Sequence, residues 1–535
     1  MIVRAAHLRL PIIVALSFLL AVAFALVLLT LTDHGTATAG SIVVNESADE
    51  LNSDGDCSLR EAITAANTDA VVDACTAGGG ADTITLPAGT YTFSIAGAGE
   101  NAAAAGDLDI TDDLTITGDG ADSTTIDAAA LDRVFHVDPV DSGITVNISG
   151  VTIQGGNPGD SGGGVQNRGN LTLERVTVTG NTAFFGGGMA VTSGTATLTD
   201  TTVDGNISEG AGGGGIFTHG DLMITNSTIS NNTEEGFAGG GIYNDSGTVM
   251  LTNSTVSGNS AKGDGGGLWN DFGDLSLLNT TVTDNASTDG FGGGVINEPN
   301  ASTLTIKNTI IAGNGASGDC AGIITSVGYN ISGDNSCGLA SIGDMSNTDA
   351  KLAPLGANGG QTQTHALMSD SPAIDNASPD CPPPDTDQRG MARPQGLACD
   401  IGSFETPVAA TPTVTPTPIN SITPTPTTTS TATPTPIANA LWGDDDCDGD
   451  ADAVDALKNL QHVAALPFTQ SDPCFPLGDP VSVTPTGPVQ RLWGDVDCDN
   501  DVDAVDALAI LRKVAALSVN QQPGCPEIGS PILAA

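Results

Sequence analysis

The sequence contains few basic residues. Lys and Arg together number 15, against 63 Asp and Glu, which gives a formal net charge of -48. So acidic a chain repels the phosphates of nucleic acids and of anionic membrane surfaces, and it favours cations or neutral ligands as partners. Charged residues make up only 15% of the 535 positions and 69 positions are Gly. This composition is typical of a turn-rich β protein and argues against a helical enzyme or a disordered polyelectrolyte.

The sequence also lacks any CxxC pair, which argues against a metal site built on thiolates. Its cysteines fall into local pairs, and an even number in an exported chain indicates disulfides. The pairing follows from proximity and from the equal spacing of the last two pairs, and the sequence alone leaves the connectivity open. The expected pairs are Cys57 with Cys75, Cys320 with Cys337, Cys381 with Cys399, Cys447 with Cys474, and Cys498 with Cys525.

The N-terminal segment has the features of an export signal. Arg4 and Arg9 flank the start of a long apolar run, and the small residues Ala37 and Ala39 follow it. Residues 1–39 are therefore predicted to be a signal peptide, or an uncleaved N-terminal membrane anchor because the apolar run is unusually long. The chain is expected to be secreted or displayed at the cell surface.

A triple-glycine signal recurs along the middle of the chain. The spacings between successive signals are 24, 27, 26, 26 and 27 residues. Each repeat holds three brief β runs separated by Gly, Asn and Asp turns, and such a unit cannot bury a face alone. The sequence therefore predicts a mainly β fold, a right-handed parallel β-helix with three short strands per coil of about 26 residues. The signals end at Gly164, Gly188, Gly215, Gly241, Gly267 and Gly294.

Changes in composition divide the rest of the chain. The segment 406–440 is almost entirely Thr, Pro, Ala and Ser, which favours an extended spacer. The predicted order is an N-terminal signal or anchor (1–39), an N-terminal cap (40–81), the β-helix (82–350), a C-terminal cap (351–405), the spacer (406–440) and a helical calcium-binding tail (441–528).

Two long motifs resemble known families. "CSLREAITAAN" at 57–67 and "DQRGMARPQGLACDIGSFE" at 387–405 resemble the exported bacterial proteins named for their CSLREA and choice-of-anchor Q segments. The triple-glycine repeats look like those of polymorphic outer-membrane proteins. These resemblances imply a β-helix at the surface of the cell or outside it, and they imply no particular activity.

Two aspartate-rich loops in the tail have the spacing of EF-hand calcium loops. Oxygen ligands at positions 1, 3, 5, 7, 9 and 12 converge on one ion because the loop winds around it. Each loop runs into an apolar helical stripe, so the tail is predicted to bind two Ca²⁺ ions and to need them for folding. The alternative is a solvated acidic surface. The predicted ligands are Asp444, Asp446, Asp448, Asp450, Asp452 and Asp455, then Asp495, Asp497, Asp499, Asp501, Asp503 and Asp506.

The paired loops resemble the type I dockerins. That resemblance implies a cohesin-like protein partner, contacted through loop positions 10 and 11, which are Ala453 and Val454 and also Ala504 and Val505. The loops are 51 residues apart, which is longer than usual. A calcium-stabilised module with another partner therefore stays open.

One outward position of the β-helix carries aromatic residues in three successive coils. Because side chains alternate along a strand, Phe217, Tyr243 and Trp269 are predicted to form one exposed column, which suits a polysaccharide. The alternative is that the rings stack on each other or lie under a terminal segment. The inward neighbours Asn244 and Asn270 are expected to form a structural hydrogen-bonded ladder.

The next outward position carries the carboxylates Asp245, Asp271 and Glu298. Adjacent coils lie about 4.8 Å apart, so these carboxylates are at the separations used by glycoside hydrolases. A lyase is disfavoured because the cluster contains no Lys or Arg. The sequence therefore predicts a carbohydrate-binding or adhesive β-helix that is not an enzyme, docked to a partner by its tail. The alternative is a dockerin-bearing glycoside hydrolase that uses these three residues.

Overall fold

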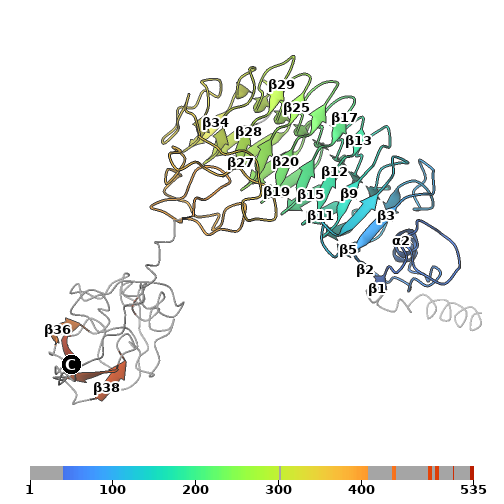
Figure 1. Ribbon diagram of the computed structural model, residues 1–535, viewed down its shortest axis with the longest axis horizontal. Coiled ribbons are helices and arrows are strands. Elements are labelled where there is room, and N and C mark those ends of the chain that lie inside the picture. The colour runs from blue at the N-terminus through green and yellow to red at the C-terminus, as the bar shows by residue number, and fades with distance from the viewer. Residues whose placement is uncertain are drawn as a thin grey trace, which may run out of the picture. The chain divides into compact units, whose positions relative to one another are not determined.

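The computed structural model describes residues 40–299 and 303–407, together with residue 510 and four short strands of the tail. The chain divides into two compact units, residues 1–413 and residues 414–535, and each is described by itself. In the first unit, short strands stack in parallel coils from the helix α2 onward (Figure 1). The predicted signal or anchor segment 1–39 lies outside the described residues. Among the described residues, no helix is long and apolar enough to cross a membrane.

Helix α2 (Leu59–Thr68) closes the N-terminal end of the coils. Ser58 caps its first turn and exchanges hydrogen bonds with Glu61, which satisfies backbone donors that a helix start leaves open. Arg60 is fully buried, where it pairs with Asp49 and donates to the carbonyls of Ala103 and Gly106. The first long motif is therefore a structural unit that starts a helix and binds it to the first coils.

The first sheet begins earlier than the sequence predicted, because a strand within the expected cap pairs with the strand that starts at Asp82. Its strands alternate buried and open residues, as expected for a sheet that faces a core on one side. In spatial order they are β1 (Ser41–Val43), β2 (Asp82–Leu86), β5 (Leu114–Gly118), β8 (Thr145–Ser149), β11 (Asn170–Glu174), β15 (Thr195–Thr199), β19 (Asp221–Thr225), β23 (Thr248–Thr252), β27 (Asp274–Leu278), β31 (Leu304–Lys307) and β34 (Thr325–Gly328).

The second sheet carries the residues that follow the triple glycines. Its register pairs Met189 with Ile216 and Ile216 with Ile242, which is the spacing of the glycine signals. In chain order its strands are β4 (Leu108–Ile110), β7 (Phe135–Val137), β10 (Val165–Asn167), β14 (Met189–Val191), β18 (Ile216–Thr218), β22 (Ile242–Asn244), β26 (Leu268–Asn270), β30 (Val295–Asn297) and β33 (Cys320–Gly322).

The third sheet closes each coil. Its strands are β3 (Gly89–Thr92), β6 (Thr124–Asp127), β9 (Thr152–Gln154), β12 (Thr177–Thr179), β16 (Thr202–Asp204), β20 (Thr228–Ser230), β24 (Thr255–Ser257), β28 (Thr281–Thr283), β32 (Ile310–Ile311) and β35 (Ile331–Ser332). Three strands per coil were predicted, and some coils carry a fourth, two-residue strand. These are β13 (Thr182–Ala183), β17 (Ile207–Ser208), β21 (Thr233–Glu234), β25 (Ser260–Ala261) and β29 (Ala286–Ser287).

Asparagine ladders run inside the coils. The predicted one is present, with Asn244 donating to Asn270 at 2.8 Å and Asn270 to Asn297 at 2.7 Å. A longer ladder that was not predicted lies at the turn that follows the third strand of each coil, before the two-residue fourth strand where there is one. Each of its amides donates to the next at about the same distance, so buried polar groups are satisfied coil after coil. Its members are Asn181, Asn206, Asn232, Asn259, Asn285 and Asn314.

The segment after β35 returns along the outer face of the third sheet (Figure 1). Gln388 of this segment hydrogen-bonds to Thr228 of β20 and to Thr255 of β24, and it thereby covers two adjacent coils. The outer residues of β20, β24 and β28 are consequently buried, whereas those of β12 and β16 are half open. This segment contains the second long motif.

The structure joins three of the expected cysteine pairs, Cys57 with Cys75, Cys320 with Cys337, and Cys381 with Cys399. Disulfides at these sites agree with an extracellular protein. The other two expected pairs lie outside the described residues.

The described part of the second unit is an antiparallel sheet that the sequence did not predict. Its spatial order is β36 (Ile437–Leu441), β39 (Pro531–Ala534), β37 (Pro480–Thr484) and β38 (Val489–Leu492). The strands bracket the two aspartate loops in the sequence. The loops themselves, with all twelve predicted calcium ligands and the predicted partner residues Ala453, Val454, Ala504 and Val505, lie outside the described residues.

Candidate functional site

The predicted aromatic column exists, but the expectation that it is exposed is wrong. The second sheet places Phe217, Tyr243 and Trp269 in register, and their exposed fractions are only 5%, 6% and 5%. Tyr243 stacks on Trp269 with ring centroids 4.2 Å apart, and Phe217 meets Tyr243 edge to face at 5.3 Å. These rings form a second apolar core outside the coil and offer no open face to a sugar.

The loops that carry the triple glycines cover this column. Gly212 has a φ of 132°, and a Cβ there would lie 2.1 Å from Cδ1 of Tyr243, so only glycine fits. Ala238 and Phe185 complete the cover over the column. Alternation along a strand decides which side chains leave the coil, and these loops decide which of them reach solvent.

Other aromatic rings are exposed on top of the cover. Phe184 and Phe237 lie two positions before the triple glycines of their coils, and Phe291 lies one position before. These three coils alternate with others, and the exposed fractions of the rings are 46%, 53% and 70%. Two coils correspond to about 9.6 Å along the axis. Phe237 rests edge to face on Trp269, with centroids 5.0 Å apart, so the buried column positions the exposed ring. The sequence signal was available, because a Phe recurs just before the triple glycine, but it was not used.

The predicted acids Asp245 and Asp271 come together at the other edge of the same face. The hydroxyl of Tyr243 lies 2.9 Å from Oδ1 of Asp245 and 3.0 Å from Oδ2 of Asp271. His219, one coil earlier, places Nε2 2.5 Å from the other oxygen of Asp245. The four side chains form a chain of polar contacts, in the order His219, Asp245, Tyr243 and Asp271.

One phenolic proton cannot be donated to two carboxylates at once. If Tyr243 donates to one of them, the second contact requires a proton on the other carboxyl group. Burial raises the pKa of Asp271, the hydrogen bond from Tyr243 lowers it in part, and the charge of Asp245 raises it further. Burial and the two carboxylates also raise the pKa of Tyr243. The raised pKa of Asp271 makes it a better proton acceptor than an ordinary aspartate.

Glu298, the third predicted acid, follows β30 one coil beyond Asp271, and its backbone N–H donates to the carbonyl of Asn270. None of the side-chain contacts that link Asp245, Tyr243 and Asp271 includes it. The structure thus brings two of the three predicted acids together.

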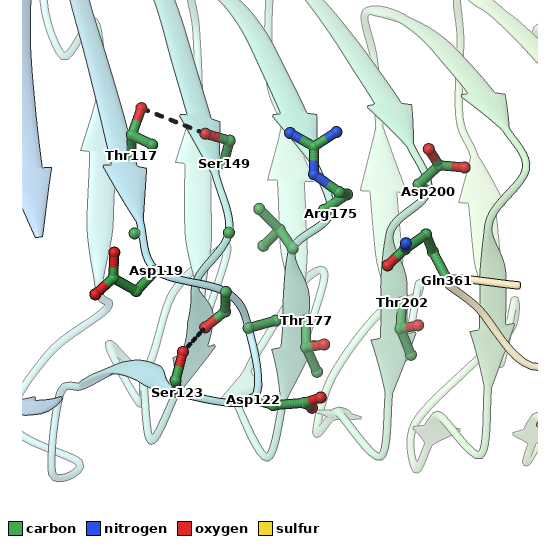
Figure 2. Close-up of a pocket in the computed structure, with 15 residues that line it drawn as sticks. Thr117, Asp119, Asp122, Ser123, Ser149, Arg175, Thr177, Asp200, Thr202 and Gln361 are labelled. Atoms are coloured by element: carbon green, nitrogen blue, oxygen red, sulfur yellow. Dashed lines mark hydrogen bonds between the residues drawn. The ribbon is translucent and has the colours of Figure 1, made fainter. Parts of the chain in front are cut away.

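A polar groove lies along the corner between the first and third sheets. It has a volume of about 590 Å³. Its lining includes Asp119 and Asp122 from one turn, Arg175 and Asp200 from two later coils, and Gln361 from the covering segment. Figure 2 shows Thr117, Ser149, Arg175 and Asp200 side by side. Burial raises the pKa of Asp200, while hydrogen bonding from Asn226 and the charge of Arg175 lower it. Carboxylates outnumber the single guanidinium, so this groove suits neutral hydroxyl groups better than polyanions.

Arg175 occupies an unusual backbone conformation in this groove. Its φ is 52°, and the equivalent corners of later coils, which share this left-handed conformation, carry Asp200, Asn226 and Asn253. Asp and Asn tolerate this region better than other residues with a Cβ, so an arginine here is strained.

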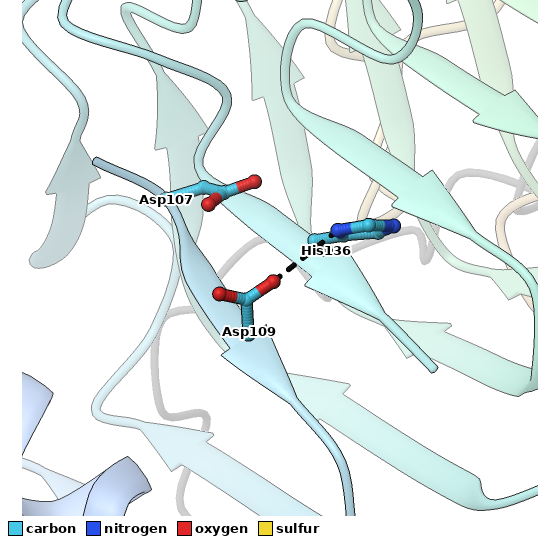
Figure 3. Close-up of side chains that lie close together, drawn as sticks. All are labelled: Asp107, Asp109 and His136. Atoms are coloured by element: carbon cyan, nitrogen blue, oxygen red, sulfur yellow. Dashed lines mark ion pairs between the residues drawn. The ribbon is translucent and has the colours of Figure 1, made fainter. Parts of the chain in front are cut away.

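An acidic cluster is buried near the N-terminal end of the second sheet. Figure 3 shows Asp109 on β4 facing His136 on β7, with Asp107 just before β4. The pKa of Asp107 is raised to about 7, mainly by burial. The charge of Asp109 also raises it, and the charge of Arg133 lowers it in part. Sequence analysis missed this group because it lies before the regular repeats.

The acids of the second long motif are engaged in structural ion pairs. Arg389 pairs with Asp387, and Arg393 pairs with Glu405 at 3.0 Å, all of them buried or nearly so. Arg393 also donates to the carbonyls of Asp400 and Gly402. These charges fold the covering segment and are not open to a ligand.

Residues 140–337 are similar to the family described as the right handed beta helix region. The coils described above are therefore those of a right-handed β-helix. A search of curated proteins finds no match. Among solved structures, the crystal structure of pectate lyase Pel9A is similar, with a TM-score of 0.42 and 14% identity over 69% of this chain and 97% of that chain.

Proposed function

We propose that the protein is an exported carbohydrate-binding β-helix whose binding surface is the outer face of the second sheet. The observation that carries this proposal is the row of exposed rings at Phe184, Phe237 and Phe291. Single exposed apolar residues are common, but exposed rings that recur beside the triple glycines of alternate coils favour an interaction surface. The row replaces Phe217, Tyr243 and Trp269 as the proposed stacking residues.

The spacing of the row suits an extended polysaccharide. The C–H groups of a sugar ring pack on the electron-rich face of an aromatic ring, and two coils span about 9.6 Å, close to the length of two β-1,4-linked sugars. Asp245, Asp271 and His219 at the opposite edge of the face offer hydrogen bonds to hydroxyl groups. The net charge of -48 favours a neutral polymer over a polyuronate.

A glycan array followed by calorimetry on the full chain tests the proposal. We expect binding to a neutral β-linked polymer that weakens in Phe237→Ala and is unchanged in Met250→Ala, a variant of another exposed apolar residue on β23. Equal binding by wild type and Phe237→Ala, or binding only to polyanions, would contradict it.

Hydrolysis of the bound glycan is the second candidate. It is favoured by the contact of one Tyr243 hydroxyl with both Asp245 and Asp271, which holds the carboxylates within about 6 Å, near the separation of retaining glycosidases. Product release that Asp245→Asn or Asp271→Asn abolishes, with binding retained, would support an enzyme. Binding with no product from wild type supports the adhesive function.

We further propose that the tail is a dockerin-like module that binds two Ca²⁺ ions and docks the β-helix to a cohesin-like protein. The repeated aspartate spacing and the identical pairs Ala453 with Val454 and Ala504 with Val505 support this proposal. Kinship with CSLREA and choice-of-anchor Q proteins belongs to the same proposal and rests on the two long motifs. Loss of partner capture on chelation, restored by Ca²⁺, is the expected result, and capture that ignores chelation would contradict it.

A further inference from the structure

The buried cluster of Asp107, Asp109 and His136 lies at the N-terminal end of the second sheet, in coils that precede those of the exposed rings Phe184, Phe237 and Phe291. One possible ligand atom from each of the three side chains lies within 4.8 Å of the others. Asp109 and His136 are register partners on the adjacent strands β4 and β7. Both side chains leave the coil on its outer side, at the start of the column that later carries Phe217 and Tyr243.

The cluster contains polar atoms that are buried without a hydrogen-bond partner. The side chain of Asp109 is 0% exposed, and its Oδ1 lies 3.2 Å from Nδ1 of His136 without the alignment of a hydrogen bond. Nε2 of His136, whose side chain is 12% exposed, is also unpartnered. A buried polar atom left unpaired costs about 1–3 kcal/mol, and more for a charged group.

The charge of the cluster is unbalanced as well. Asp107 accepts a hydrogen bond from Arg133 at 2.8 Å, and Arg133 also pairs with the exposed Asp160. Asp132 is buried beside them, and its Oδ2 has no partner. One guanidinium thus interacts with the carboxylates of Asp107, Asp132 and Asp160. Asp109 adds a further charge beside Asp107, and the nearby Arg60 is engaged by Asp49. Buried carboxylates of this number require a further cation or bound protons.

We propose that Asp107, Asp109 and His136 bind a divalent transition-metal cation of the zinc class. An imidazole nitrogen with two carboxylate oxygens is the donor set that Zn²⁺ takes in proteins, whereas Ca²⁺ takes oxygen ligands alone. The ion would satisfy Oδ1 of Asp109 and offset the surplus negative charge. It would also join β4 to β7 where the N-terminal cap meets the coils, since Asn67 of α2 hydrogen-bonds to the backbone of Asp109 and Thr111.

The test uses the full chain, stripped of metal and then held in millimolar Ca²⁺ so that the tail loops are filled. Titration with Zn²⁺ is followed by calorimetry and by thermal unfolding. We expect one tight equivalent in wild type and an increase in Tm, both lost in His136→Gln. His219→Gln is the matched control, because His219 is an exposed histidine that also contacts a carboxylate, and it should keep both effects.

A measurement on the wild type guards against a variant that fails to fold. X-ray absorption of the zinc-loaded chain should show one imidazole among oxygen ligands. The proposal would be overturned if Ca²⁺ displaced Zn²⁺, or if His136→Gln still bound one tight equivalent of Zn²⁺. A zinc environment without imidazole would also overturn it.

Discussion

The ring of Phe237 meets the ring of Trp269 edge to face, with centroids 5.0 Å apart and planes at 69°. The buried ring of Trp269 thereby fixes the orientation of the exposed ring of Phe237. Truncating Phe237 removes only surface packing, so we expect Phe237→Ala to keep the fold and to weaken glycan binding about tenfold, the loss of roughly 1.4 kcal/mol. Calorimetry against the array-selected glycan measures it, with Met250→Ala as the unaffected control.

The bridge between Tyr243 and Asp271 predicts how stability depends on pH. The raised pKa of Asp271 means that the folded state holds this proton more tightly than the unfolded state. Its contribution is therefore favourable at acidic pH and is lost as the pH rises through the folded pKa. Asp271→Asn, which cannot ionise, should lose less stability than wild type as the pH rises above about 4 in denaturation experiments. Parallel curves for the two proteins would contradict this.

His365 gives the opposite dependence. Burial lowers its pKa from the ordinary value of 6.5, and its ring bridges Ser257 of β24 and the carbonyl of Ala353. The unfolded chain takes up this proton first, so stability is complete above pH 6.5 and falls as the pH drops toward the folded pKa. The protection factors of the covering segment in hydrogen exchange, which are corrected for the intrinsic pH dependence of exchange, should fall between pH 7 and 5 in wild type. In His365→Gln the same change should be much smaller.

The strained corner at Arg175 predicts a stabilising substitution. Asparagine tolerates a φ of 52° better than arginine, so Arg175→Asn should raise the free energy of unfolding by about 1 kcal/mol. Arg175→Ala removes the same charge and keeps the strained backbone, and it should give no gain. Chemical denaturation of the two variants separates backbone strain from charge, and equal stabilisation by both would show that charge is responsible.

Removing calcium should affect the two units differently. The twelve predicted aspartate ligands all lie in the tail, so excess chelator should abolish a low-temperature calorimetric transition and leave that of the β-helix unchanged. Asp495→Asn should reduce the bound calcium from two equivalents to one. An identical calorimetric trace with and without chelator would refute the calcium loops.

The coil register was predictable because strict spacing of the triple glycines sets which strands pair. Met189, Ile216 and Ile242 each follow such a signal and stand one above another in the structure. The same period of the repeat correctly predicted that Asp245 and Asp271 are neighbours in adjacent coils. A repeat read from sequence thus fixes both the fold and the neighbours along one column.

Exposure could not be predicted in this way. Whether Tyr243 is open depends on the path of the loop at Gly212, which the strand period does not describe. Asp109 and His136 escaped notice because their coils precede the regular repeat. The hydrogen bond between Gln388 and Thr255 joins residues 133 positions apart, and no local sequence pattern predicts it.

The covering segment has a consequence for the order of folding. A chain that emerges from its amino end forms β20, β24 and β28 well before Gln388 and Ser403 exist to lie on them. The outer side chains of these strands include Thr228, Thr255 and Thr281. Water can solvate their hydroxyl groups before the covering segment is made. An apolar outer face that stayed uncovered during synthesis would promote aggregation. Water can thus hydrate the outer face of β20, β24 and β28 until the covering segment, which follows β35 in the chain, lies over it.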